Sequence, residues 1–137
     1  MSAKVQVSLE DIEKVKSLNI PEAVTVNIVT DYLVTVKHNS HIRLIMAVIF
    51  VVMMLYNIFF AGNSYSISTA NTIMITLFSI EGVLATLMIY QFVLFMKAVK
   101  KIRDVIKRYS AQRGLEYKPA KKAYANLLKK EYGGIGL

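Results

Sequence analysis

The chain has 137 residues, of which 55% are hydrophobic, and a formal net charge of +8 at pH 7. This length suits one structural unit rather than two globular domains. The chain has no cysteine, which excludes disulfides, thiol catalysis and thiolate metal sites. Its hydrophobic residues are concentrated in the middle of the chain, whereas a soluble fold of this size would spread them along amphipathic stripes.

The N-terminal region, residues 8–38, is predicted to be helical. Ser8, three residues before Asp11, resembles a capping box, and apolar residues then recur at helical spacing, so 9–18 is predicted to be a short helix. The segment 23–37 alternates β-branched residues as a strand would, but the same residues also form a helical stripe. Because nothing else in the chain resembles a strand that could pair with it, we expect a helix.

Two apolar runs joined by an uncharged polar loop dominate the centre of the chain. The first, Leu44–Ala61, carries no charge, and the second, Thr72–Met96, carries only Glu81. A helix rises about 1.5 Å per residue, so each run is long enough to cross a hydrocarbon layer about 30 Å thick. The loop, residues 62–71, is rich in turn-forming side chains. This pattern predicts a hairpin of two long hydrophobic, membrane-type helices over residues 41–96.

The ends of the two long helices are predicted from local signals. Asn39 or Ser40 can cap the first spanning helix, which is expected to run to about Phe60. The second is expected to start near Asn71, to continue beyond its apolar run as a basic amphipathic helix, and to end at Gly114. A soluble bundle with two buried helices is the alternative, but two adjacent runs of spanning length exceed what a small core needs.

The C-terminal region, residues 97–137, is predicted to be basic and helical, with a last helix that begins at Pro119 and ends at Gly133. Residues 1–7 are predicted to form a loose arm. Together these segments predict an all-α fold, in which a helical hairpin of two long hydrophobic helices is flanked by shorter N- and C-terminal helices. We expect the chain to form a single structural unit.

Charge is distributed unevenly about the hairpin. The chain before Leu44 carries five basic and five acidic residues, whereas the chain from Lys97 onward carries twelve basic and three acidic residues, and the loop carries none. By the positive-inside rule, an inserted hairpin would keep both termini in the cytoplasm. Phosphates of anionic lipids and of nucleic acid are both candidate targets, and no sequence-reading motif is present, so nucleic-acid contact would be non-specific. The candidate contacts are Lys97, Lys100, Lys101, Arg103, Lys107, Arg108, Arg113, Lys121 and Lys122.

Small residues follow one face of the second apolar run, where they would let another helix backbone approach closely. They are Thr72, Thr76, Ser79, Gly82 and Thr86. Their hydroxyls could instead bond only their own backbone carbonyls. Because the stripe and the opposite face each call for a protein neighbour, and the hairpin partner covers only one, we expect an extended homo-oligomer.

Glu81 lies roughly opposite the small-residue stripe. In a hairpin centred near residue 66 it is level with Val52, and Arg43 is about 13 Å further along the first helix, so the hairpin offers no ion-pair partner. We expect an intersubunit or a buried, protonated carboxyl. Proton or ion transport through Glu81 is the alternative.

The sequence offers no pattern typical of catalysis. His38 and His41 could share a helix face, but without a third ligand they favour interfacial histidines over a metal site. We find no Gly-rich phosphate loop, no paired carboxylates in a plausible cleft and no Ser/His/Asp set. We therefore expect neither enzyme activity nor a cofactor.

The layout resembles the hydrophobic major capsid proteins of archaeal spindle-shaped viruses, especially the large tailed kind. The runs 44–61 and 72–96, the turn 62–71 and the absence of Cys and Trp carry this resemblance, which covers roughly residues 40–130. The segment 8–38 exceeds what the smallest such proteins carry, which favours the larger type. The resemblance implies a structural protein that passes through the host cell membrane and then builds the virion shell or tail by helical assembly.

On this interpretation, hydrophobic helices pack between copies and the basic region contacts the genome during DNA packaging. Two other functions stay open at this point. One is a cellular two-span integral membrane scaffold or accessory protein with a basic cytoplasmic tail. The other is a small ion- or proton-conducting oligomer built around Glu81.

Overall fold

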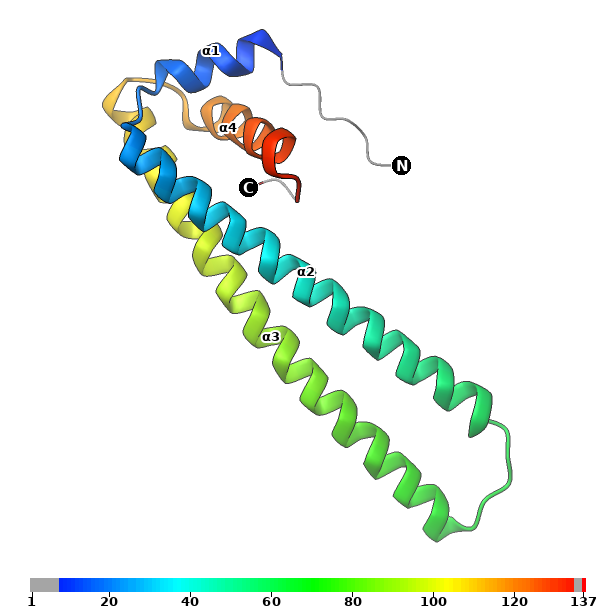
Figure 1. The fold of residues 1–137 in the computed structure, drawn as a ribbon. Coiled ribbons are helices and arrows are strands. Elements are labelled where there is room, and N and C mark those ends of the chain that lie inside the picture. Colours follow the sequence, from blue (N-terminus) through cyan, green and yellow to red (C-terminus); the bar gives the residue numbers. More distant parts are fainter. Residues whose placement is uncertain (1–7, 135–136) are drawn as a thin grey trace. The chain divides into compact units, whose positions relative to one another are not determined.

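A computed structural model describes residues 8–134 and 137 of the chain, and this part is all-α, without a strand. Its helices are α1 (Leu9–Ser17), α2 (Glu22–Phe59), α3 (Ile67–Gln112) and α4 (Tyr117–Tyr132) (Figure 1). Two long apolar helices lie in sequence between two shorter ones, which confirms the predicted fold class and the helical choice for 23–37. The predicted loose arm, residues 1–7, lies outside the described residues.

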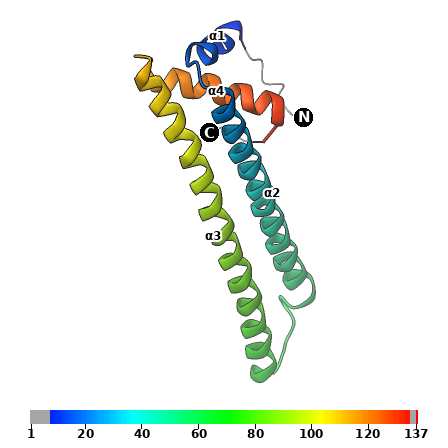
Figure 2. The same cartoon turned by 60° about the vertical axis from the view of Figure 1, so that its left-hand side comes forward.

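Helix α1 begins where the sequence predicts. The Ser8 Oγ accepts a hydrogen bond from the backbone N–H of Asp11 at 3.1 Å, which caps the helix. The Asp11 carboxylate in turn accepts a hydrogen bond from the side-chain amide of Asn126 in α4 at 3.2 Å. Helices α1 and α4 pack against each other, so the first turn of α1 is also a tertiary contact (Figure 2).

Helix α2 is continuous, and the predicted start of a separate helix at Asn39 or Ser40 is wrong. The helix runs unbroken from Glu22 to Phe59 and contains neither Gly nor Pro. Asn and Ser cap a helix only where the chain leaves the helical conformation. Nothing forces the chain to leave it here, and continuing the helix keeps every backbone hydrogen bond.

Helix α3 begins at Ile67, earlier than the predicted Asn71. The Ser66 Oγ accepts a hydrogen bond from the backbone N–H of Thr69 at 3.2 Å, so a serine inside the predicted loop acts as the cap. The connection between α2 and α3 is therefore residues 60–66. At the other end, Gly114 adopts a positive φ of 65° after the helix, as predicted for a residue in this position.

The described chain divides into two compact units. The terminal unit comprises the chain up to His38 and from Leu94 onward, and the hairpin unit is Asn39–Val93. The two flanking regions share one unit and one core. The core residues are Leu18, Ile28, Tyr32, Ile102, Ile106, Ala120, Tyr124 and Leu128. They come from the α1–α2 connection and from α2, α3 and α4.

The hairpin unit has no buried core. Helices α2 and α3 run antiparallel through it (Figure 1), and none of residues 39–93, all of which the structure describes, is buried. Half-buried positions recur every three or four residues on both helices, which is typical of two helices packed at a shallow angle. The rows include Ile42, Ile45, Ile49, Val52 and Tyr56 on α2, and Ile73, Leu77, Glu81, Leu84, Met88 and Gln91 on α3.

Candidate functional site

The outer surface of the hairpin unit is apolar on both helices. Helices α2 and α3 are each long and apolar enough to cross a membrane, and no residue in the most apolar stretch of either is buried. Phe50 is 68% exposed, Ile75 is 67% exposed and Phe78 is 63% exposed. Soluble monomers rarely expose a contiguous apolar patch larger than a few hundred Å². An apolar surface of this kind is typical of helices that lie in lipid or against other protein.

The predicted small-residue stripe lies on the exposed side of α3. All five of its residues are exposed, and a Cβ built on Gly82 would meet no atom within 4 Å. Each hydroxyl of the stripe donates to the backbone carbonyl four residues earlier, at distances of 2.7 to 3.0 Å. The alternative left open by the sequence, in which these hydroxyls bond only backbone carbonyls of their own helix, is therefore what one chain shows. A second helix on this face stays a prediction.

Glu81 is half-buried in the row of α3 that faces α2. The Tyr56 hydroxyl of α2 lies 3.7 Å from the Met74 sulfur of α3, so the two helices are in contact near the connection. The predicted level of Glu81 with Val52 stays a prediction. Glu81 forms no ion pair within the described residues.

The two histidines that share α2, His38 and His41, are both half-buried and both have interactions within the chain. No group of three or more side chains suited to a metal ion occurs in the described part of the chain.

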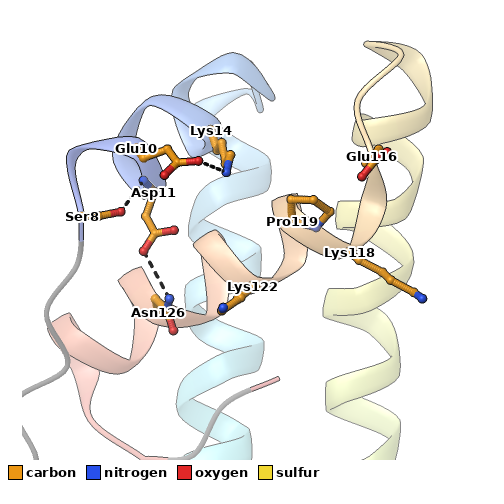
Figure 3. Close-up of a pocket in the computed structure, with 9 residues that line it drawn as sticks. All are labelled: Ser8, Glu10, Asp11, Lys14, Glu116, Lys118, Pro119, Lys122 and Asn126. Atoms are coloured by element: carbon orange, nitrogen blue, oxygen red, sulfur yellow. Dashed lines mark hydrogen bonds and ion pairs between the residues drawn. The ribbon is translucent and has the colours of Figure 1, made fainter.

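An open cleft of about 610 Å³ lies between α1 and α4, lined by charged side chains of both signs (Figure 3). Within it Lys14 pairs with Glu10, and Asp11 with Asn126, so several of its polar groups are already satisfied.

All nine predicted phosphate contacts belong to the terminal unit. Seven are exposed, and Arg103 and Lys121 are half-buried. Lys101 lies 3.9 Å from the Asp31 carboxylate of α2, and the other eight are in no ion pair among the described residues. A basic surface with so few carboxylate partners is typical of proteins that bind polyanions.

Arg103 of α3 and Lys121 of α4 come close enough to affect each other. Burial, and secondly the charge of Arg103, lower the pKa of the Lys121 ammonium below its usual range. The Arg103 Nε is buried without a hydrogen-bond acceptor among the described residues. Sequence reasoning named both residues as basic contacts but had no signal that α3 and α4 would bring them together.

Comparison of the chain with protein-family models, with curated proteins and with solved structures gives no significant match.

Proposed function

We propose that the protein is a structural, self-assembling major capsid protein, whose hairpins pack against those of other copies to form the shell or tail of a virion. The observation that carries the proposal is a hairpin, residues 39–93, that has no buried residue and exposes large apolar side chains along both helices. Covering that surface is strongly favourable, and a shell of many copies covers it without lipid. No chemistry at an active site is needed for this role.

The small-residue stripe favours other copies over lipid as the covering partner. A lipid-facing helix gains nothing from Thr, Ser or Gly, whereas helices that pack in apolar surroundings use them to bring their backbones together. The hydroxyls of Thr72, Thr76 and Ser79 already donate to backbone carbonyls, so burying them leaves no unsatisfied donor. Gly82 leaves room for a neighbouring backbone.

The terminal unit supplies a second requirement of a shell that encloses a genome. Eight of its nine predicted cations have no carboxylate partner among the described residues, so they are available to neutralise phosphates. The proposal includes a stage in the host cell membrane before assembly, when lipid covers the hairpin and the basic residues lie on the cytoplasmic side. This life cycle is the one implied by the resemblance to coat proteins of archaeal spindle-shaped viruses.

Electron microscopy with protein and lipid quantified in the same particles tests the proposal. The full chain is purified in detergent, and the detergent is then removed with and without added phospholipid. Without lipid, we expect ordered tubes or shells that consist of this chain. If ordered particles never form and the chain is recovered only dispersed in lipid vesicles, the shell proposal is wrong and a two-span membrane scaffold replaces it.

A further inference from the structure

Two neighbouring hollows on the surface of α4 differ in charge. One is the cleft of about 610 Å³ between α1 and α4, and the other is a depression of about 460 Å³ lined by α4 and Leu137. Lys118, Lys122 and Asn126 line both of them. The cleft balances its three lysines with three carboxylates, those of Glu10, Asp11 and Glu116. The depression is lined by three lysines, which include Lys121, and by no Asp or Glu side chain. A polyanion is therefore favoured at the depression and not in the cleft.

The three lysines of the depression are not neutralised by the rest of the chain. None of them forms an ion pair with a described residue, Leu137 included. Lys118 precedes the other two by three and four residues, so all three side chains leave α4 on one side. Lys118 and Lys122 are exposed and Lys121 is half-buried, and Figure 3 shows Lys118 extending away from α1. Like charges at this spacing repel one another, so an anion placed among them is stabilised.

The other residues of the depression suit a phosphate group. Ala125 is buried, and its short side chain leaves the space between the lysines open. Tyr117 packs against the terminal core and adds a hydroxyl that can donate a hydrogen bond. Each ammonium offers three donors, and the free oxygens of a phosphodiester accept charge-assisted hydrogen bonds.

We propose that Lys118, Lys121 and Lys122 bind the phosphodiester backbone of a nucleic acid in this depression. Contacts of this kind position a nucleic acid without reading its base sequence. The site rests on the genome-enclosing function proposed above.

The attachment of α4 to α3 favours nucleic acid over lipid as the source of the phosphodiester. Helix α4 shares its core with Ile102 and Ile106 of α3. The apolar run ends at Met96, so these two residues lie about 9 and 15 Å further along the helix axis. The headgroup layer on each side of a bilayer is only about 5 to 8 Å thick. Helix α4 is therefore attached beyond the headgroups of a bilayer that holds the hairpin.

Binding of a fluorescent DNA duplex to the full chain in detergent micelles tests the site. At about 50 mM salt, Lys121→Gln is expected to weaken binding about tenfold and to lower the slope of affinity against salt by about one. Lys121→Arg keeps the charge and should bind as the parent chain does. The matched control is Lys130→Gln, which removes an exposed lysine of α4 that lines neither hollow and should change affinity far less.

Thermal unfolding without DNA, followed by circular dichroism, separates binding from folding. Lys118→Gln and Lys122→Gln replace exposed side chains, so both should unfold at the temperature of the parent chain. Each should lose affinity for DNA as Lys121→Gln does. These two variants decide the question even if Lys121→Gln, whose side chain is half-buried, does not fold.

Acetylation of lysines, followed by mass spectrometry, locates the bound polyanion without any substitution. DNA should protect Lys118, Lys121 and Lys122 in the parent chain, whereas Lys14, on the α1 side of the cleft and paired with Glu10, should react as it does without DNA. In proteoliposomes, replacing part of the phosphatidylcholine with phosphatidylglycerol should leave the three lysines as reactive as before.

Three results would overturn the site. They are losses of affinity no larger than that of Lys130→Gln, full reactivity of the three lysines with DNA bound, and protection by phosphatidylglycerol without protection by DNA. The last result would assign the depression to lipid phosphates. Each of them rejects the site even if the chain forms shells. Conversely, a chain that forms no shells but shows the expected DNA losses rejects the capsid proposal and leaves the site standing.

Discussion

At the residue scale, the terminal unit depends on a close approach between α2 and the residues that follow α4. Tyr32 of α2 is fully buried, and its hydroxyl donates a hydrogen bond to the backbone carbonyl of Gly133 at 2.6 Å. Gly134 adopts a positive φ of 84°, and a Cβ on it would lie 2.6 Å from the Cγ2 of Val36. Glycine is required here both by conformation and by space.

Gly134→Ala is expected to destabilise the terminal unit by about 2 kcal/mol, because the new methyl group adds a clash to the strain of a positive φ. Thermal unfolding followed by circular dichroism measures the loss. The control is Gly114→Ala, where φ is also positive at 65° but the Cβ meets no atom within 4 Å, so only the strain remains. Equal losses in the two variants would contradict the contact with Val36.

Buried tyrosines predict a loss of stability at high pH. Burial raises the pKa of Tyr32 and of Tyr124 above the ordinary value of 10.0. A folded-state pKa above the unfolded value contributes stability that is complete below about pH 10 and is lost as the pH rises through the raised pKa. The thermal unfolding midpoint should therefore decrease as the pH rises above 10. The Tyr32→Phe variant should show a smaller decrease.

Ultraviolet absorbance of phenolate gives an independent measurement of the same effect. The chain contains eight tyrosines, and we expect the parent chain to show a late-ionising fraction that decreases in Tyr32→Phe. If Tyr32→Phe loses stability over the same pH range and by the same amount as the parent, the buried hydroxyl of Tyr32 is not the titrating group.

At the element scale, the parts of α2 and α3 that form the hairpin unit, residues 39–93, have no buried core. Within the hairpin unit, each helix packs one narrow row of side chains against the other helix and leaves its remaining apolar side chains exposed. A carboxylate, Glu81, occupies one position of the shared row on α3. The pairing of two helices through such a narrow contact is weak, which is compatible with the exchange of lipid for other copies that we propose.

Gly82 provides a test of the outer face of α3. Because its Cβ would meet nothing in one chain, Gly82→Ala and Gly82→Leu should both leave the helicity of the detergent-solubilised protein unchanged or slightly increased. If another backbone packs there, Gly82→Ala should assemble nearly as the parent does, whereas Gly82→Leu should reduce the assembled fraction severalfold. Sedimentation after detergent removal measures that fraction. Normal assembly of Gly82→Leu would remove the small-residue stripe from the proposed interface.

At the scale of the whole molecule, a unit with a core and a unit without one share two continuous helices. The terminal unit buries residues from all four helices or their connections, whereas residues 39–93 bury none. The first unit can therefore be stable by its own packing, and the second depends on what surrounds it. In the proposed function, the hairpin unit carries self-assembly and the terminal unit carries phosphate contact.

Ile106→Ala tests whether the two units are energetically separate. The side chain is fully buried in the terminal core, so its truncation should cost about 2 to 5 kcal/mol. Hydrogen exchange measured peptide by peptide should show lost protection in α1, α4 and the core segments of α2 and α3, with residues 45–90 unchanged. Equal loss of protection throughout α2 and α3 would show that the chain unfolds as one unit.

Much of the fold could be predicted because its signals are local. The Ser8 cap, the two apolar runs and the glycine after α3 each depend on residues a few positions apart. Predictions of helix ends were wrong where a local signal allows a helix to begin but does not require it. Asn39 and Ser40 can start a helix but need not, and Ser66 caps α3 although it lies inside the stretch predicted to be loop.

The sequence by itself determined the fold class, the two hydrophobic helices and the concentration of positive charge after Met96, because composition and periodicity report what environment each residue needs. Only the tertiary structure decided which helices pack together to provide that environment. It brought residues from 8–38 and 97–137 into one core and turned the face of α3 with Glu81 toward α2. These pairings depend on contacts between residues far apart in the chain, which periodicity along one helix does not encode.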